Sequence, residues 1–296
     1  MTTTTRALLL LLISVMTTMA AAGQTTRRIN PGTSKPEWTQ PYAPFRIAGN
    51  LYYVGTYDLA CYLITTPKGH ILINTGVAGS DTVIRKNMKQ LGFALSDIRV
   101  LLTNQAHFDH VGAMAAIQKQ TGARVYANVA DATVLADGGY SDYLFGGKDL
   151  LFEPVTADRL LFDRDTIKWG GMELTLLHHP GHTKGSSSYL FTVKDQKRSY
   201  KVLIANMPSV IVDSFAQVQA TYPNIVADYT ETYAEMEGLN FDLWLAAHAS
   251  QMDLQEIYHP AKGYQPEVFG DKNKYLEELK KWKVGYEEKL KGKSSQ

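Results

Sequence analysis

Histidine and acidic side chains cluster in the segment Gln-Ala-His-Phe-Asp-His, residues 105–110, a pattern typical of a metal-binding loop. Imidazole nitrogen and carboxylate oxygen are the normal ligands of catalytic zinc, at about 2.0–2.2 Å. Alternate side chains of an extended segment share a face. Gln105, His107 and Asp109 are therefore expected to point one way, and His110, at the turn into a helix, another way. Such a loop can serve two adjacent metal ions, which explains the cluster better than a polar loop whose histidines cap the helix.

A second segment with metal-ligating residues is His-His-Pro-Gly-His-Thr-Lys-Gly, residues 178–185, which closes an apolar run. Its Pro-Gly pair predicts a tight turn that presents His182. His178 and His179 are neighbours on a predicted strand, so at most one of them faces the same side as the site. We interpret both as structural or supporting residues, and expect one direct ligand from this segment.

The third candidate ligand is His248, which closes the apolar run Leu-Trp-Leu-Ala-Ala-His. A lone histidine after a strand is usually structural, but functional residues collect where strands hand over to loops, and two histidine-bearing loops precede this one. His70 and His259 lie beside a turn and in a polar stretch, and both are expected at the surface. Cys61, the single cysteine, lies in an apolar strand-like run and is expected to be a buried packing residue.

The pattern of apolar residues predicts the strands and helices that position these residues. Runs at 51–57, 61–66 and 70–76 predict a β-meander, and residues 24–45 an irregular arm. A helix is expected from Ser80, which would cap it, to Gly92. Further strands are predicted at 98–104, 124–128, 166–180, 186–206 and 243–248, and further helices at 113–120, 129–136, 229–237 and 272–291. This mixture predicts an α/β fold with helices packed outside mixed sheets, in one domain over residues 24–296.

The balance of charged residues and the pattern of the N-terminal residues indicate where the protein is located and which partners it does not bind. Lys and Arg number 30 against 29 Asp and Glu, which argues against nucleic acid or an acidic membrane surface as partner. Arg6 precedes the apolar run Ala7–Met16, and small residues follow at 20–23, a pattern typical of a cleaved export signal over residues 1–23. The run is shorter than the roughly 20 residues that a membrane span needs. We expect a periplasmic protein without membrane attachment after cleavage.

The three loops, in this order and spacing, resemble the metallo-β-lactamase superfamily, whose hallmark is H-x-H-x-D-H after a strand, followed by two distant histidines. The resemblance covers nearly all of the chain after the signal. It implies a four-layer αβ/βα sandwich with the metal site along one edge. Within the superfamily the chain resembles subclass B3, which implies one or two Zn²⁺ ions. His107 and His182 would then serve the first site, and Asp109, His110 and His248 the second.

Gln105 departs from the common pattern, in which a histidine holds this position. The departure matches the GOB-type branch of subclass B3, which carries glutamine there. The stretches at 44–60, 178–186 and 203–213 also resemble that branch. An amide oxygen is a weaker zinc ligand than imidazole, because zinc favours nitrogen. The ion bound by Gln105 is therefore expected to be lost more easily than the ion of the second site.

The resemblance implies hydrolysis of the β-lactam ring amide in penicillins, cephalosporins and carbapenems, and hence antibiotic resistance. Zinc would lower the pKa of a bound water toward about 7, and the resulting hydroxide would attack the lactam carbonyl. Asp109 would orient that hydroxide as well as ligate. Ser209 corresponds to a family serine that binds the substrate carboxylate. Lys184 is a second candidate contact, with a solvated surface charge as the alternative, and a monomer is expected.

Other classes of function fit these residues less well. Thioesterases of the glyoxalase II type and lactonases usually place a metal-bridging aspartate between the third and last histidines, where this chain has Asn206 and Met207. A non-enzymatic zinc protein would have closed four-ligand sites, whereas Gln105 and Asp109 indicate an open one. A serine β-lactamase is not supported, because the chain lacks an S-x-x-K motif.

Overall fold

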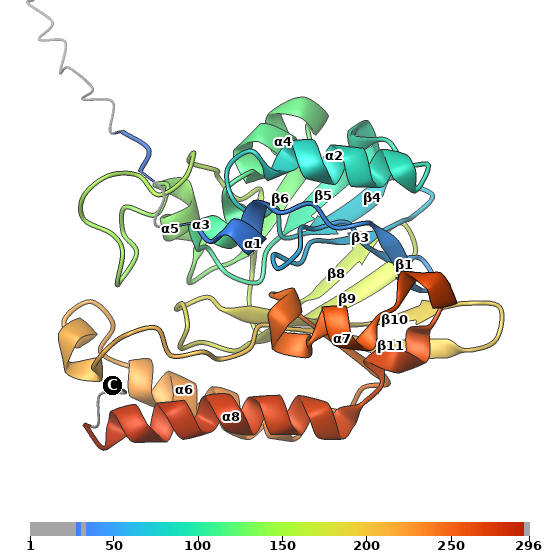
Figure 1. Cartoon of the computed structure of the whole chain (residues 1–296). Helices are drawn as coiled ribbons and strands as arrows, with labels where there is room; N and C mark the ends of the chain where they lie inside the picture. Colours follow the sequence, from blue (N-terminus) through green and yellow to red (C-terminus); the bar gives the residue numbers. More distant parts are fainter. Residues whose placement is uncertain (1–27, 31–33, 293–296) are drawn as a thin grey trace, which may run out of the picture.

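The structure, a computed structural model, describes residues 28–30 and 34–292 (Figure 1). The predicted export signal, residues 1–23, lies outside the described residues. The strands are β1 Phe45–Ala48, β2 Leu51–Tyr53, β3 Tyr62–Ile64, β4 His70–Ile73, β5 Ile98–Leu102, β6 Arg124–Asn128, β7 Arg159–Leu161, β8 Thr166–Trp169, β9 Met172–His178, β10 Ser187–Lys194, β11 Ser199–Ala205 and β12 Leu243–Ala246. The α-helices are α1 Pro36–Thr39, α2 Ser80–Gln90, α3 Phe108–Val111, α4 Met114–Thr121, α5 Ala132–Ala136, α6 Ile225–Glu237, α7 Leu254–Ile257 and α8 Lys272–Leu290.

The strands form two mixed sheets. One has seven strands in the order β1-β2-β3-β4-β5-β6-β7, and the other has five in the order β12-β11-β10-β9-β8. The first sheet is antiparallel from β1 to β4 and parallel from β4 to β7. In the second sheet only β11 and β12 run parallel. Helices connect the consecutive parallel strands, because two parallel strands cannot be joined by a tight turn.

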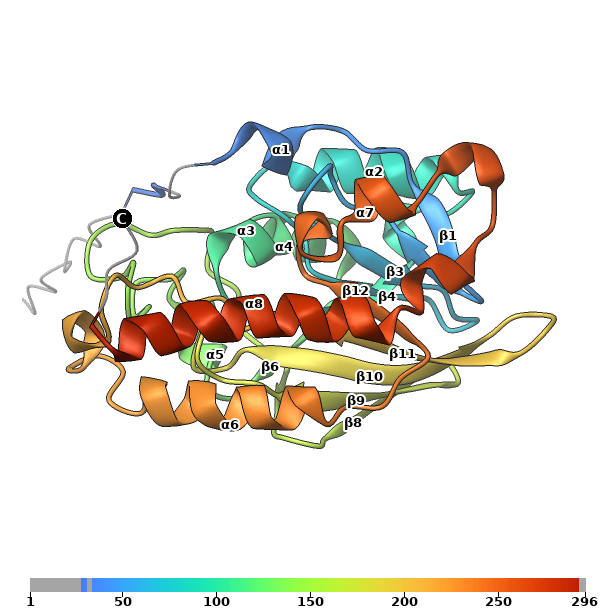
Figure 2. The same cartoon turned by 60° about the horizontal axis from the view of Figure 1, so that its bottom comes forward.

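Helices cover the outer face of each sheet, so the molecule has four layers (Figures 1 and 2). α2 and α4 lie on the seven-stranded sheet, and α6 and α8 lie on the five-stranded sheet. Alternation along β4 shows how the layers are held together: Ile71 and Ile73 belong to the apolar cluster that includes the second sheet, whereas Leu72 packs in the cluster beneath α2 and α4. The predicted αβ/βα sandwich is confirmed.

Several local expectations needed correction. Ser80 does not cap α2: the N-cap is Gly79, at φ 88°, and the Ser80 side chain is buried. The helix expected at 129–136 begins only at Ala132, and the irregular arm contains the short helix α1. His70 is half-buried rather than exposed: its ring packs edge-on against Phe93, and its Nδ1 accepts the Thr66 N–H at 3.3 Å. His259 is exposed, and Cys61 is buried, as predicted.

Among the helices of residues 28–30 and 34–292, none combines the length and the apolar character that crossing a membrane requires.

Candidate active site

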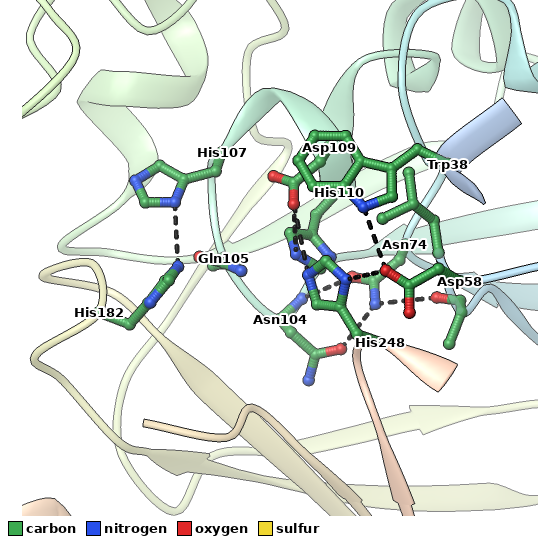
Figure 3. Close-up of polar contacts among 12 residues, drawn as sticks. Trp38, Asp58, Asn74, Asn104, Gln105, His107, Asp109, His110, His182 and His248 are labelled. Atoms are coloured by element: carbon green, nitrogen blue, oxygen red, sulfur yellow. Dashed lines mark hydrogen bonds and ion pairs between the residues drawn. The ribbon is translucent and has the colours of Figure 1, made fainter. Parts of the chain in front are cut away.

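Loops from three separate strands meet at one edge of the sandwich. β5, β9 and β12 lead into the loops that carry the predicted ligands. The two sheets touch here: Leu59, between β2 and β3, forms an isolated bridge with His248, and the Ala60 N–H donates to the Ala247 carbonyl at 3.1 Å. This junction brings His248, the last ligand in the chain, to the residues that follow β5. The predicted convergence of the three loops is therefore present in the structure (Figure 3).

His107 and His182 form the first half of the site. Nδ1 of His107 lies 3.2 Å from Nε2 of His182. The other nitrogen of each ring has a fixed partner: Nε2 of His107 donates to Asp142 at 3.2 Å, and Nδ1 of His182 donates to the Ser209 carbonyl at 2.8 Å. The two remaining nitrogens are thereby held toward each other. Gln105 lies between this pair and the other ligands in the view of Figure 3.

Asp109, His110 and His248 form the second half. Each offers one ligand atom, and the three atoms lie within 4.8 Å of one another. Oδ2 of Asp109 is 3.4 Å from Nε2 of His110 and 3.4 Å from Nε2 of His248. The far nitrogen of His248 donates to Asp58 at 3.1 Å, which fixes the orientation of the ring.

The grouping corrects one expectation from strand alternation. Asp109 was expected to point with Gln105 and His107, and His110 elsewhere, but Asp109 and His110 point to the same place. Backbone extension ends at His107, the N-cap of α3 at φ −87° and ψ 152°, and Phe108–Val111 is helical. A period of two no longer applies once the helix begins. Asp109, His110 and His248 thus lie together, and His107 lies beside His182.

Burial and neighbouring charges set the protonation of four of the candidate ligands. Burial lowers the pKa of His110 to about 4 and that of His182 to about 3, so both rings are neutral at pH 7. Burial alone would raise the pKa of Asp109, but the imidazoles of His110 and His248 hold it well below its usual range. For His248, burial would lower the pKa, but the carboxylates of Asp109 and Asp58 raise it to about 9. Asp109, His110 and His248 would hold a cation here, and His248 would have to give up its proton to ligate it.

The donor set fits zinc. Gln105 Oε1 and His110 Nε2 are buried and have no hydrogen-bond partner within the described parts of the chain. An unpaired buried polar atom costs about 1–3 kcal/mol, and a metal ion would satisfy both atoms. His107, His182 and Gln105 would hold one ion, and Asp109, His110 and His248 a second. Three protein donors for each ion leave positions open for water or substrate, as in catalytic zinc sites.

Asp131 ties the first two ligand loops together. Its Oδ2 accepts the Ala106 N–H at 2.9 Å and the Thr183 hydroxyl at 2.8 Å, and its Oδ1 accepts the Gly185 N–H at 2.7 Å. Ala106 lies between Gln105 and His107, and Thr183 follows His182 directly. One buried carboxylate therefore fixes the backbone beside three of the candidate ligands.

The residues that orient the ligands were not predicted from the sequence. Asp58, Asp131 and Asp142 are buried carboxylates that contact ligand rings or ligand loops. Trp38 donates its Nε1–H to Asp58 at 3.1 Å and so completes the support of the second cluster. A zinc-bound histidine usually donates its other ring nitrogen to an acceptor, so the existence of such partners was predictable. Their identity was not, because they are far from the ligands in sequence.

The histidine clusters open into a cavity of about 520 Å³ with aromatic walls that include Trp38, Phe108 and Phe145. Ser209 lines this cavity, and its hydroxyl lies 3.0 Å from Nδ1 of His182. Lys184 does not line it: its ammonium lies 5.5 Å from the ring centroid of Tyr222. The structure thus brings one of the two predicted substrate contacts to the cavity and leaves the other outside.

His178 and His179 lie outside the two ligand groups. His178 Nε2 is 2.8 Å from the Lys184 carbonyl, and the buried His179 has its Nδ1 2.7 Å from the Ser188 hydroxyl. These contacts hold the ends of β9 and its following turn. The structural interpretation of both histidines agrees with this placement.

Comparison with known proteins identifies close relatives. Residues 56–195 match the model of the metallo-beta-lactamase superfamily. The crystal structure of the metallo-β-lactamase GOB-18 from Elizabethkingia meningoseptica is 52% identical, with a TM-score of 0.87 over 90% of this chain and 99% of that one. The class B3 di-zinc metallo-β-lactamase LRA-12, from an Alaskan soil metagenome, is 54% identical, with a TM-score of 0.86 over 89% of this chain and 100% of that one.

Curated relatives match only in part. A probable metallo-hydrolase, YqgX of Bacillus subtilis, is 29% identical over 48% of this chain and 64% of its own length. A hydroxyacylglutathione hydrolase of Bradyrhizobium is 30% identical over 44% of this chain and 42% of its own length. The chain thus spans less than two thirds of these relatives.

Proposed function

Because the chain belongs to the metallo-β-lactamase family, and within it to class B3, we propose that it hydrolyses the ring amide of β-lactam antibiotics. The substrates are penicillins, cephalosporins and carbapenems, and the result is antibiotic resistance. The single observation that carries the proposal is the pair of three-donor groups beside one cavity, with Gln105 Oε1 and His110 Nε2 buried and without a hydrogen-bond partner in the part of the chain that the structure describes. Enzymes of this family at more than half identity over their full length support the substrate class.

Zinc is the cofactor, and when bound it supplies Lewis acidity that polarises the lactam carbonyl and makes water more acidic. The protein's part is to hold the ligands in place. Asp142 and the Ser209 carbonyl orient the two imidazoles of the first group, and Asp58 orients His248. Asp109 stays ionised beside the imidazoles, so it can ligate and also accept a hydrogen bond from the attacking water.

The substrate carboxylate is assigned to the Ser209 end of the cavity. Ser209 lines the cavity beside His182, so its hydroxyl is available to an anionic group held next to the metal ligands. Lys184 is kept as a weaker second candidate contact: its side chain is half-buried against Tyr222 and does not line the cavity.

The location and state of the enzyme form part of the same proposal. Residues 1–23 act as an export signal, and residues 24–296 form the metallo-hydrolase domain, which works in the periplasm as a monomer without membrane attachment. The Ala7–Met16 run, with Arg6 before it and small residues after it, supports export. Fractionation of cells that express the full chain, with N-terminal sequencing of the product, tests it. An unprocessed cytoplasmic product contradicts it.

The decisive experiment measures hydrolysis of nitrocefin and imipenem by the purified protein. We expect rapid opening of both rings, loss of activity after EDTA treatment, and recovery when Zn²⁺ is restored. A thioester of glutathione and a homoserine lactone serve as competing substrates. Turnover of either of these without β-lactam opening would overturn the assignment in favour of a thioesterase or lactonase of the same fold.

A further inference from the structure

The cavity has two chemically different ends, set by the groups behind the two histidine clusters. At one end Ser209 lies behind His182. At the other end Asp58 lies behind His248, and the Trp38 indole covers Asp58 through its hydrogen bond. Figure 3 shows His182 and Trp38 on opposite sides of the ligand cluster.

A cation lies at the Trp38 end. Lys35 lines the cavity, and its ammonium lies 5.6 Å from the ring centroid of Trp38. Within residues 28–30 and 34–292 this ammonium has no carboxylate partner. Trp282, from α8, also lines the cavity, and its buried indole N–H has no hydrogen-bond partner among the described residues. The Lys35 ammonium is thus a charged donor on the cavity wall that lacks a carboxylate acceptor among the described residues.

Nearby acidic groups do not neutralise Lys35. Asp58 already accepts from His248, the Trp38 indole and the Ser250 N–H. Asp109 lies between its two imidazoles. Both carboxylates contact the ligand cluster and neither is an ion-pair partner of Lys35, so its exposed ammonium is available to an anionic group that enters the cavity.

We propose that Lys35, with the ring of Trp38, forms a subsite for a negatively charged substituent on the acylamino side chain of the β-lactam. The inference rests on the proposed function. In a bicyclic β-lactam the ring carboxylate and the acylamino group project from opposite ends of the nucleus. With the carboxylate at Ser209, the acylamino substituent reaches the Lys35 end. The aromatic faces take its apolar part, and the ammonium its charge.

Three penicillins with the same nucleus test this subsite: benzylpenicillin is neutral at the benzylic carbon, carbenicillin carries a carboxylate there, and ampicillin an ammonium. We expect Lys35→Ala to lower kcat/KM for carbenicillin relative to benzylpenicillin roughly two- to fivefold, mainly through KM, as for an exposed ion pair. The same variant should raise the relative value for ampicillin. Lys35→Glu should enlarge both changes, and Lys35→Arg should leave the ratios near wild type. Added salt should weaken the wild-type preference.

Lys119→Ala, at an exposed position on α4, is the matched control and should leave all three ratios unchanged. An equal loss for all three penicillins in Lys35→Ala would mean that Lys35 binds the ring carboxylate, and the subsite proposal would be wrong. Unchanged ratios would equally overturn it. A wild-type protein that opens none of the three rings would instead refute the proposed function, so the two failures are distinguishable.

Discussion

Asp131 provides the sharpest test of how the fold positions the first metal site. Its carboxylate accepts hydrogen bonds from the backbone at Ala106 and Gly185 and from the Thr183 hydroxyl, at 2.7 to 2.9 Å. The substitution Asp131→Asn keeps the shape of the side chain but replaces one acceptor oxygen with an NH₂ donor. With the amide oxygen toward Ala106 and Thr183, the NH₂ group faces the N–H of Gly185. We therefore expect both loops to loosen without a change in packing volume.

The expected loss in the free energy of unfolding follows from the loss of one buried hydrogen-bond acceptor. An orphaned buried N–H costs about 1–3 kcal/mol. Burial raises the pKa of Asp131, so removing its charge recovers part of this cost, while the hydrogen bond from the Gly185 N–H is lost. We expect a net loss of roughly 1–2 kcal/mol in the free energy of unfolding of the zinc-free protein. For a domain of this size that corresponds to a Tm lower by about 2–8 °C.

The assay combines the Tm of the zinc-free protein with zinc content after dialysis. Asp131→Asn should retain less zinc than wild type, and the loss should fall on the ion held by the Gln105 group. Asp158→Asn is the matched control, because Asp158 accepts the Val125 N–H at 2.8 Å away from the ligands. It should lower the Tm without zinc loss. Full zinc retention in Asp131→Asn, despite a lower Tm, would refute the positioning role, and an unchanged Tm would refute the energetic argument.

The remaining predictions concern the ligands directly. Gln105→His should retain more zinc on dialysis, because imidazole is the better ligand; unchanged zinc content would contradict the ligand-strength argument. Asp109→Ala should lower kcat/KM more than about 100-fold, whereas His259→Ala should leave it near wild type, since His259 is exposed and distant; equal values would place the site elsewhere. Asp58→Asn should weaken zinc binding about 10- to 100-fold by releasing His248, as measured by competition with a chromophoric chelator. EDTA should lower the Tm of the wild type, because zinc binds only the folded chain, and an unshifted Tm would argue against a bound metal.

Local patterns predicted the mixed sheets with helices outside and the ligand loops, whereas the four-layer sandwich was implied by the family resemblance. Apolar runs ending in histidine mark where strands hand over to a functional edge, and the strands at β5, β9 and β12 were placed within a few residues. The direction of individual ligands was harder. Asp109 was assigned by strand alternation, although a helix begins at Phe108. A four-residue helix such as α3 gives too few residues for its period to be read.

The carboxylates that orient the ligand histidines could not be identified from local sequence patterns. Asp142 and His107 are 35 residues apart, and Asp58 and His248 are 190 apart. A general rule requires an acceptor behind each zinc-bound imidazole, yet the chain has 29 acidic residues from which to choose. Only the tertiary fold selects among them.

The Asp58–His248 contact shows how that selection is made. The bridge between Leu59 and His248 joins the two sheets, and the Ala249 N–H donates to the Asp58 carbonyl at 2.6 Å. Backbone pairing therefore sets Asp58 beside the ring, and the carboxylate then receives both the ring N–H and the Trp38 indole. Because the same pairing closes the sandwich edge, formation of the second metal cluster is coupled to docking of the two sheets. Zinc bound there should consequently stabilise the junction between the sheets more than the remote β8 edge, and amide exchange at Ala60 and Ala249 should slow most when zinc is added.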